Sequence, residues 1–186
     1  MVSLASLWLP ILLSAVLVFV VSALVHMVLP IHRKDFAQLP GEANVLEAMR
    51  KENVASGDYV FPCPQSMKEM KSPEMMKKYE QGPVGFLTII PSGPPAMGAS
   101  LVQWFVYSLV VGVFIAYLAS RTLIAGTEYL QVFRVAGTAA FLAYAGTQPV
   151  QSIWGKRKWS TTAKHVMDGF LYALVTAGAF AGFWPE

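Results

Sequence analysis

The chain has 186 residues, of which 55% are hydrophobic and only 13% are charged, and its formal net charge is +3. A soluble domain carries about a quarter charged residues, so this composition excludes an ordinary soluble protein and indicates an integral membrane protein. The basic residues are scattered or follow apolar segments, which favours a place at the membrane surface over nucleic-acid binding. A single cysteine, Cys63, excludes an intramolecular disulfide and a thiolate-rich metal site.

The first predicted element is a transmembrane helix within residues 1–30. Its apolar block runs from Ser6 to Leu29, and the basic residues Arg33 and Lys34 follow it. A secretory signal peptide carries its positive charge before the apolar segment, so we expect this helix to be retained. Pro10 falls in its first turn, where the missing N–H costs little.

Residues 31–97 form one predicted extramembrane segment, which is too polar and too rich in proline to cross the bilayer. Its pattern predicts a short helix over 42–53, an extended stretch over 59–64, and a helix that begins after Ser72 and ends at Gly82. The apolar run over 84–90 fits either a short strand or an interfacial strap. Because prolines interrupt it throughout, this segment should bury little core and pack on the membrane face or on a partner.

Residues 98–186 are predicted to form a three-helix transmembrane region, with spans at about 99–120, 129–148 and 162–184. The first of these has no charged residue over 22 positions, which is about the length that crosses a hydrocarbon core. The predicted fold class is therefore an all-α integral membrane protein with four transmembrane helices and one proline-rich extramembrane loop that carries short helices.

Basic residues next to the spans predict the orientation. By the positive-inside rule, the side with more Lys and Arg faces the cytoplasm. Only Arg121 lies on the opposite side. The residues on the basic side are Arg33, Lys34, Lys156, Arg157, Lys158 and Lys164. We therefore expect both termini outside and the long loop in the cytoplasm, in a bacterial inner membrane.

Small residues recur at every fourth position along two of the predicted spans. Such a ridge lets another helix approach backbone to backbone. The two ridges are Ser108, Gly112, Ala116 and Ser120, and Gly169, Ala173, Ala177 and Ala181. They indicate packing against neighbouring spans of the same chain or against another subunit.

Two histidines, His26 and His165, are predicted at the same cytoplasmic end of their helices. Imidazoles at one membrane depth can bind a haem, a chlorophyll-type pigment or a metal ion, with His32, Asp35 and Asp168 nearby. The alternative is that they are interfacial side chains that bind a carbonyl group or a lipid headgroup. No HExxH, CxxCH or paired-carboxylate spacing is present, so no catalytic residue or required cofactor is assigned and the chain is not expected to be an enzyme.

A polar stripe runs along the third predicted span. It consists of Gln131, Arg134 and Thr138, with Gln148 on roughly the same face. Ionisable groups inside a membrane mark functional sites by default, so the stripe suggests a transport pathway or a contact with anionic lipid. The alternative is an arginine that reaches up to the interface. No carboxylate is expected at depth in any span, which argues against a proton relay.

Together these features predict an accessory, structural transmembrane subunit that stabilises a larger membrane complex of photosynthetic or respiratory electron transport. Its partners would be other membrane subunits and lipids, and not nucleic acid. One alternative is a small transporter or channel component that uses the polar face around Arg134. Another is a haem-, pigment- or metal-binding membrane protein that uses His26 and His165.

Overall fold

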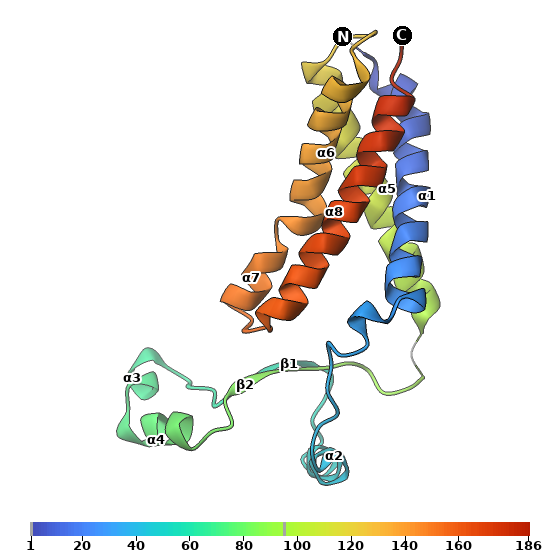
Figure 1. Cartoon of the computed structure of the whole chain (residues 1–186). Helices are drawn as coiled ribbons and strands as arrows, with labels where there is room; N and C mark the ends of the chain where they lie inside the picture. The colour runs from blue at the N-terminus through green and yellow to red at the C-terminus, as the bar shows by residue number, and fades with distance from the viewer. Residues whose placement is uncertain (1, 95) are drawn as a thin grey trace. The chain divides into compact units, whose positions relative to one another are not determined.

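The computed structural model describes residues 2–94 and 96–186, which form two compact units (Figure 1). One unit consists of residues 1–37 and 96–186, and the other of residues 38–95. The chain is mostly helical, at 67%, which confirms the predicted helical character. A small two-stranded sheet in the second unit departs from the all-α prediction.

The first unit is a bundle in which four long helices run side by side (Figure 1). Its first helix, Leu4–Val28, is continuous through a 3-10 start, η1, the α-helix α1 and a π-helical end, η2. The elements of this unit are η1 (Leu4–Leu7), α1 (Trp8–Ala23), η2 (Leu24–Val28), η3 (Pro30–His32), α5 (Met97–Thr122), α6 (Tyr129–Ala145), α7 (Gln148–Ile153) and α8 (Trp159–Gly182).

Two helices are long and apolar enough to cross a membrane, namely Leu4–Val28 and Met97–Thr122. They correspond to the first two predicted spans. A span needs about 20 predominantly apolar residues. Helix α6 has 17 residues, because the predicted span 129–148 is divided: α6 ends at Ala145 and α7 begins at Gln148. By length and composition the described residues thus hold two candidate membrane-spanning helices, and the predicted four are not confirmed.

The first small-residue ridge packs against α1. All four of its residues, Ser108, Gly112, Ala116 and Ser120, are buried. A Cβ atom at Gly112 would lie 3.3 Å from the side chain of Ile11 and 3.4 Å from its carbonyl oxygen. Only a glycine-sized residue permits this separation, so the ridge brings the backbones of α5 and α1 together.

The second ridge packs mainly against α6. A Cβ atom at Gly169 would lie 2.8 Å from the Cβ of Ala145 and 2.9 Å from its backbone nitrogen. Further along the helix, a Cβ atom at Gly137 would lie 3.1 Å from the Cβ of Ala177. Ala173 and Ala181 are also buried. The structure therefore places both ridges in contacts between helices of the same chain.

The second unit contains α2 (Glu42–Lys51), β1 (Gly57–Phe61), α3 (Met67–Met70), α4 (Pro73–Gln81) and β2 (Gly85–Ile89). Strands β1 and β2 pair in antiparallel register, with Gly57 opposite Ile89 and Phe61 opposite Gly85. The predicted helices over 42–53 and after Ser72 are confirmed, and Ser72 Oγ accepts a hydrogen bond from the Met75 N–H at 3.2 Å. Of the two alternatives for the run over 84–90, a strand or an interfacial strap, the structure shows the strand. Helix α3 was not predicted.

The second unit has almost no core, as its proline content predicts. Among its described residues, Met75 alone is buried. Both strands of the hairpin leave large side chains partly exposed, including Tyr59, Val60 and Phe86. The densely packed part of the chain is therefore the helix bundle, and the candidate site lies there.

Candidate metal centre

All three histidines of the chain gather with two aspartates at one end of the helix bundle. His26 lies in η2 at the end of the first helix, and His165 and Asp168 lie in the first turns of α8. The chain then turns: Leu29 is extended, as expected before a proline, and the 3-10 turn η3 follows. This turn places His32 and Asp35 beside α8. We call these five residues the histidine–aspartate cluster.

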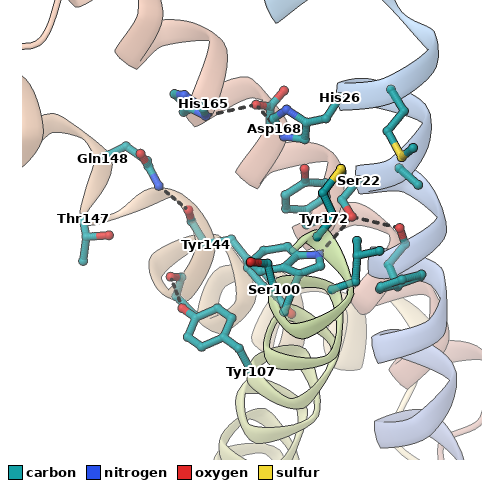
Figure 2. A pocket seen from close by; sticks show the side chains of 17 residues that line it. Ser22, His26, Ser100, Tyr107, Tyr144, Thr147, Gln148, His165, Asp168 and Tyr172 are labelled. Atoms are coloured by element: carbon teal, nitrogen blue, oxygen red, sulfur yellow. Dashed lines mark hydrogen bonds and ion pairs between the residues drawn. The ribbon is translucent and has the colours of Figure 1, made fainter. Parts of the chain in front are cut away.

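The three imidazole rings surround one carboxylate oxygen. Asp168 Oδ2 lies 3.1 Å from His32 Nε2, 3.5 Å from His165 Nδ1 and 3.8 Å from His26 Nε2. The ring centroids are 4.4 to 6.1 Å apart, and the ring planes are inclined by 29° to 32°. Figure 2 shows His26, His165 and Asp168 together at one end of a cavity. Ligand atoms lie within 4.8 Å of one another in two overlapping groups, His26, His32 and Asp168, and His32, Asp35 and His165.

Asp168 is the buried centre of this cluster. The residue is 5% exposed, and its Oδ2 atom has no hydrogen-bond partner among the described residues. His32 Nε2 is also without one, because its 3.1 Å approach to Asp168 does not have the direction of a hydrogen bond. A buried carboxylate costs several kcal/mol unless a positive charge or hydrogen bonds compensate it. A cation at this point would provide that compensation.

Asp35 and Lys164 hold His32 from the other side. His32 Nδ1 lies 2.6 Å from Asp35 Oδ2, while Lys164 Nζ donates to Asp35 Oδ1 and, at 2.8 Å, to the carbonyl oxygen of Ile31. The hydrogen bond from Lys164 is the main reason that the pKa of Asp35 lies below its usual value, and the bond from His32 lowers it further. His32 is therefore held at Nδ1 by Asp35, and its Nε2 atom lies on the Asp168 side of the ring.

The donor set has the composition and spacing of a transition-metal site. His26, His32 and Asp168 each offer one ligand atom, and these atoms lie within 4.8 Å of one another. Around a tetrahedral ion with bonds of about 2.0–2.2 Å, ligand atoms are about 3.3 Å apart. The two nitrogen-to-oxygen distances within this group, 3.1 Å from His32 Nε2 and 3.8 Å from His26 Nε2, are close to that value. Two histidines and one carboxylate suit Zn²⁺ or Fe²⁺ and leave a coordination position open, which His165 can approach.

The comparisons with known proteins give no identity. No family model matches this chain, and neither the curated proteins nor the solved structures contain a detectable match. The function must therefore be inferred from the cluster and its surroundings.

The structure brings the predicted pair His26 and His165 together, but it gives no room for a haem between them. The two ring centroids are 6.1 Å apart, and the ring of His32 packs against both, at 4.4 and 5.1 Å. A porphyrin would need an open slot between its two axial ligands. The geometry therefore favours a bare metal ion over a haem held between the two histidines.

A cavity of about 540 Å³ adjoins the cluster and is lined by residues from all four long helices (Figure 2). One wall consists of four aromatic rings in mutual contact, those of Trp104, Tyr107, Tyr144 and Tyr172, which we call the aromatic wall. Trp104 Nε1 donates to Ser22 Oγ at 2.9 Å, which fixes the indole between α5 and α1.

The predicted polar stripe lies on the outside of the bundle. Gln131, Arg134 and Thr138 are all exposed. Gln148 does not share their face, because its side-chain oxygen accepts a hydrogen bond from Arg157 at 3.0 Å. Arg134 and Thr138 line a groove of about 290 Å³ on the bundle surface, between α6 and α8.

The expectation that no carboxylate lies inside a span is wrong. Asp168 falls within the predicted span 162–184 and is buried in α8. The sequence held the signal that would have placed it: His165 and Asp168 are three residues apart and so share one helix face. The prediction therefore named Asp168 only as a neighbour of the site, whereas the structure puts it at the centre.

Proposed function

We propose that this protein is an integral membrane protein that binds one divalent transition-metal ion of the Zn²⁺ or Fe²⁺ class. His26, His32 and Asp168 are its ligands, its fourth position is open, and His165 lies beside the site, with Nδ1 3.5 Å from Asp168 Oδ2. The observation that carries this proposal is the buried Asp168 oxygen, which has no hydrogen-bond partner among the described residues and is faced by three imidazole nitrogens.

Four membrane-spanning helices are part of the proposal. In support, α6 and α8 lie alongside the two apolar helices, and the bundle buries small and polar residues while it exposes large apolar ones on every long helix (Figure 1). Exposed apolar residues include Leu12, Val16, Val110, Phe114, Leu130, Leu142, Phe170 and Leu174. With both ends of the chain outside, the positive-inside rule puts the histidine–aspartate cluster at the cytoplasmic surface.

An accessory role in a larger membrane complex remains a prediction, and it is compatible with a bound metal ion. The small-residue ridges no longer argue for it, because they pack within the chain. The second unit does argue for it, since a segment with one buried residue among those described has much surface left for a partner. Isolation in mild detergent with a native mass measurement tests this role.

The metal site is tested on protein without a polyhistidine tag, purified in detergent and stripped with a chelator. Calorimetric titration with Zn²⁺, and with Fe²⁺ under anaerobic conditions, should show one saturable site per chain, and metal analysis should give the same stoichiometry. His32→Ala should abolish that site. An Asp58→Asn variant in the second unit is the matched control and should bind normally. The absence of saturable binding of either ion would overturn the proposal.

A further inference from the structure

We propose that the cavity beside the histidine–aspartate cluster binds a lipid-soluble molecule whose head is a planar ring with carbonyl oxygens, the chemistry of a quinone. The head would lie against the aromatic wall with one oxygen towards Asp168. This inference deepens the proposed function, and it rests on that function in one respect: the bound ion neutralises the carboxylate that the head faces.

The size and lining of the cavity fit such a ligand. Small-molecule sites commonly enclose about 300–1,000 Å³ and combine an apolar lining with a few polar groups. This cavity encloses about 540 Å³, and polar side chains, among them Ser22, Ser100 and Gln148, are spread along its mostly apolar lining (Figure 2). The ligand should therefore be amphipathic.

The aromatic wall favours a planar head. Its rings contact one another with centroids 5.6 to 6.2 Å apart. Flat rings stack on such a surface in offset or edge-on geometry, whereas a branched aliphatic head would contact it less completely. Two hydrogen bonds fix the orientation of the wall: Tyr107 donates to the Ala143 carbonyl oxygen, and Trp104 donates to Ser22 Oγ.

Tyr172 supplies a donor that lacks an acceptor. The residue is 5% exposed, and its hydroxyl has no hydrogen-bond partner among the described residues. Tyr172 belongs to the aromatic wall and lies one helical turn after Asp168 on α8, and both residues line the cavity (Figure 2). A small rotation of the ring would let the hydroxyl donate to a ligand carbonyl. An ester or quinone oxygen satisfies it, whereas an amine does not.

Charge argues against a cationic head, which would meet the bound ion and the imidazoles around it. A neutral head meets no such conflict. At the rim, the flexible apolar side chains of Met27, Met97 and Leu101 are exposed and line the cavity, so an isoprenoid or alkyl tail can leave towards the lipid there.

The test measures binding of a decyl-substituted benzoquinone to the purified protein in lipid nanodiscs, through quenching of tryptophan fluorescence. Nanodiscs without protein and a Trp104→Phe variant establish how much of the signal comes from the cavity. Tyr172→Phe removes only the hydroxyl and should weaken binding about three- to tenfold. Tyr129→Phe, at an exposed position at the start of α6, is the matched control and should leave the affinity unchanged.

A second variant keeps the test decisive if Tyr172→Phe folds poorly. Ser100 is exposed, lines the cavity and is not packed in the bundle core, so Ser100→Phe should fill the cavity and lower the affinity at least tenfold. Titrations are run on chelator-treated and Zn²⁺-loaded protein. Zn²⁺ binding without saturable quinone binding to the loaded protein would overturn this inference and leave the metal site standing. Tighter binding of palmitate or of a cationic detergent than of the quinone would overturn it as well.

Discussion

Replacing Asp168 by Asn tests the centre of the histidine–aspartate cluster, because the two side chains have almost the same shape. Four-ligand zinc sites bind with about 10–16 kcal/mol, which is about 2.5–4 kcal/mol per ligand. Loss of the carboxylate ligand should therefore weaken Zn²⁺ binding by about two to three orders of magnitude. Competition with a chromophoric chelator measures this change, with Asp58→Asn as the control.

The same variant should have the opposite effect on the metal-free protein. Asn removes a buried carboxylate that has no hydrogen-bond partner on Oδ2 among the described residues. We expect a gain of about 1–2 kcal/mol in the free energy of unfolding. For a chain of this size, each kcal/mol raises the melting temperature by about 2–4 °C.

The two effects of Asp168→Asn, weaker Zn²⁺ binding and a more stable metal-free protein, distinguish a metal site from a structural ion pair. If Asp168 serves only to pair with protonated histidines, Asp168→Asn will lower the melting temperature of the chelated protein and will change Zn²⁺ affinity little. A Zn²⁺ affinity within threefold of the parent, together with such a loss of stability, would refute the reasoning.

Three further changes probe the packing around the site. Gly169→Ala should cost about 1–3 kcal/mol of stability, since its Cβ would meet backbone atoms of α6, whereas Gly178→Ala has no described neighbour within 4 Å and should be neutral or slightly stabilising in a thermal melt. Equal effects of the two would contradict the close α6–α8 contact. Lys164→Met should reduce Zn²⁺ affinity about tenfold, because it releases Asp35 and His32. Lys158→Met, at an exposed position, should leave the affinity unchanged. If calorimetry shows the larger loss for Lys158→Met, Lys164 does not support the site. Ser72→Ala should lower the stability of α4 by about 1 kcal/mol, seen as faster amide exchange in its first turn, and unchanged exchange there would show that the cap contributes nothing.

The sequence predicts local features of this fold well, because they depend on neighbouring residues. The cap at Ser72 and the small-residue ridges are visible as spacings of three or four positions, and the structure shows the matching contacts. The division of the third predicted span was missed, since residues 129–148 are apolar enough to be continued as one helix. Its end at Ala145 is set by tertiary packing, where Gln148 binds Arg157.

The candidate site was predictable in its members and unpredictable in its geometry. Helix length and charge bias put His26 and His165 at one depth, and nothing in either pattern tells which ring nitrogen faces which oxygen. The decisive residue is His32, whose position depends on the turn after Val28 and on hydrogen bonds to Asp35 from a helix more than a hundred residues away. The cavity likewise arises from four helices that are distant in sequence.

The way this cluster is held bears on how a metal ion would act. Lys164 already ties the turn to α8 through the Ile31 carbonyl oxygen and Asp35, so His32 is placed before any ion arrives. Zinc-finger domains differ, because their ligands are brought together only by the metal and the apo protein is unfolded. Here the tight α6–α8 and α1–α5 contacts and the Lys164 bonds give the protein its fold, and the ion compensates one buried charge. Chelation should therefore empty the site and leave the bundle intact, which makes the ion available for exchange, ligand binding or chemistry at its open position.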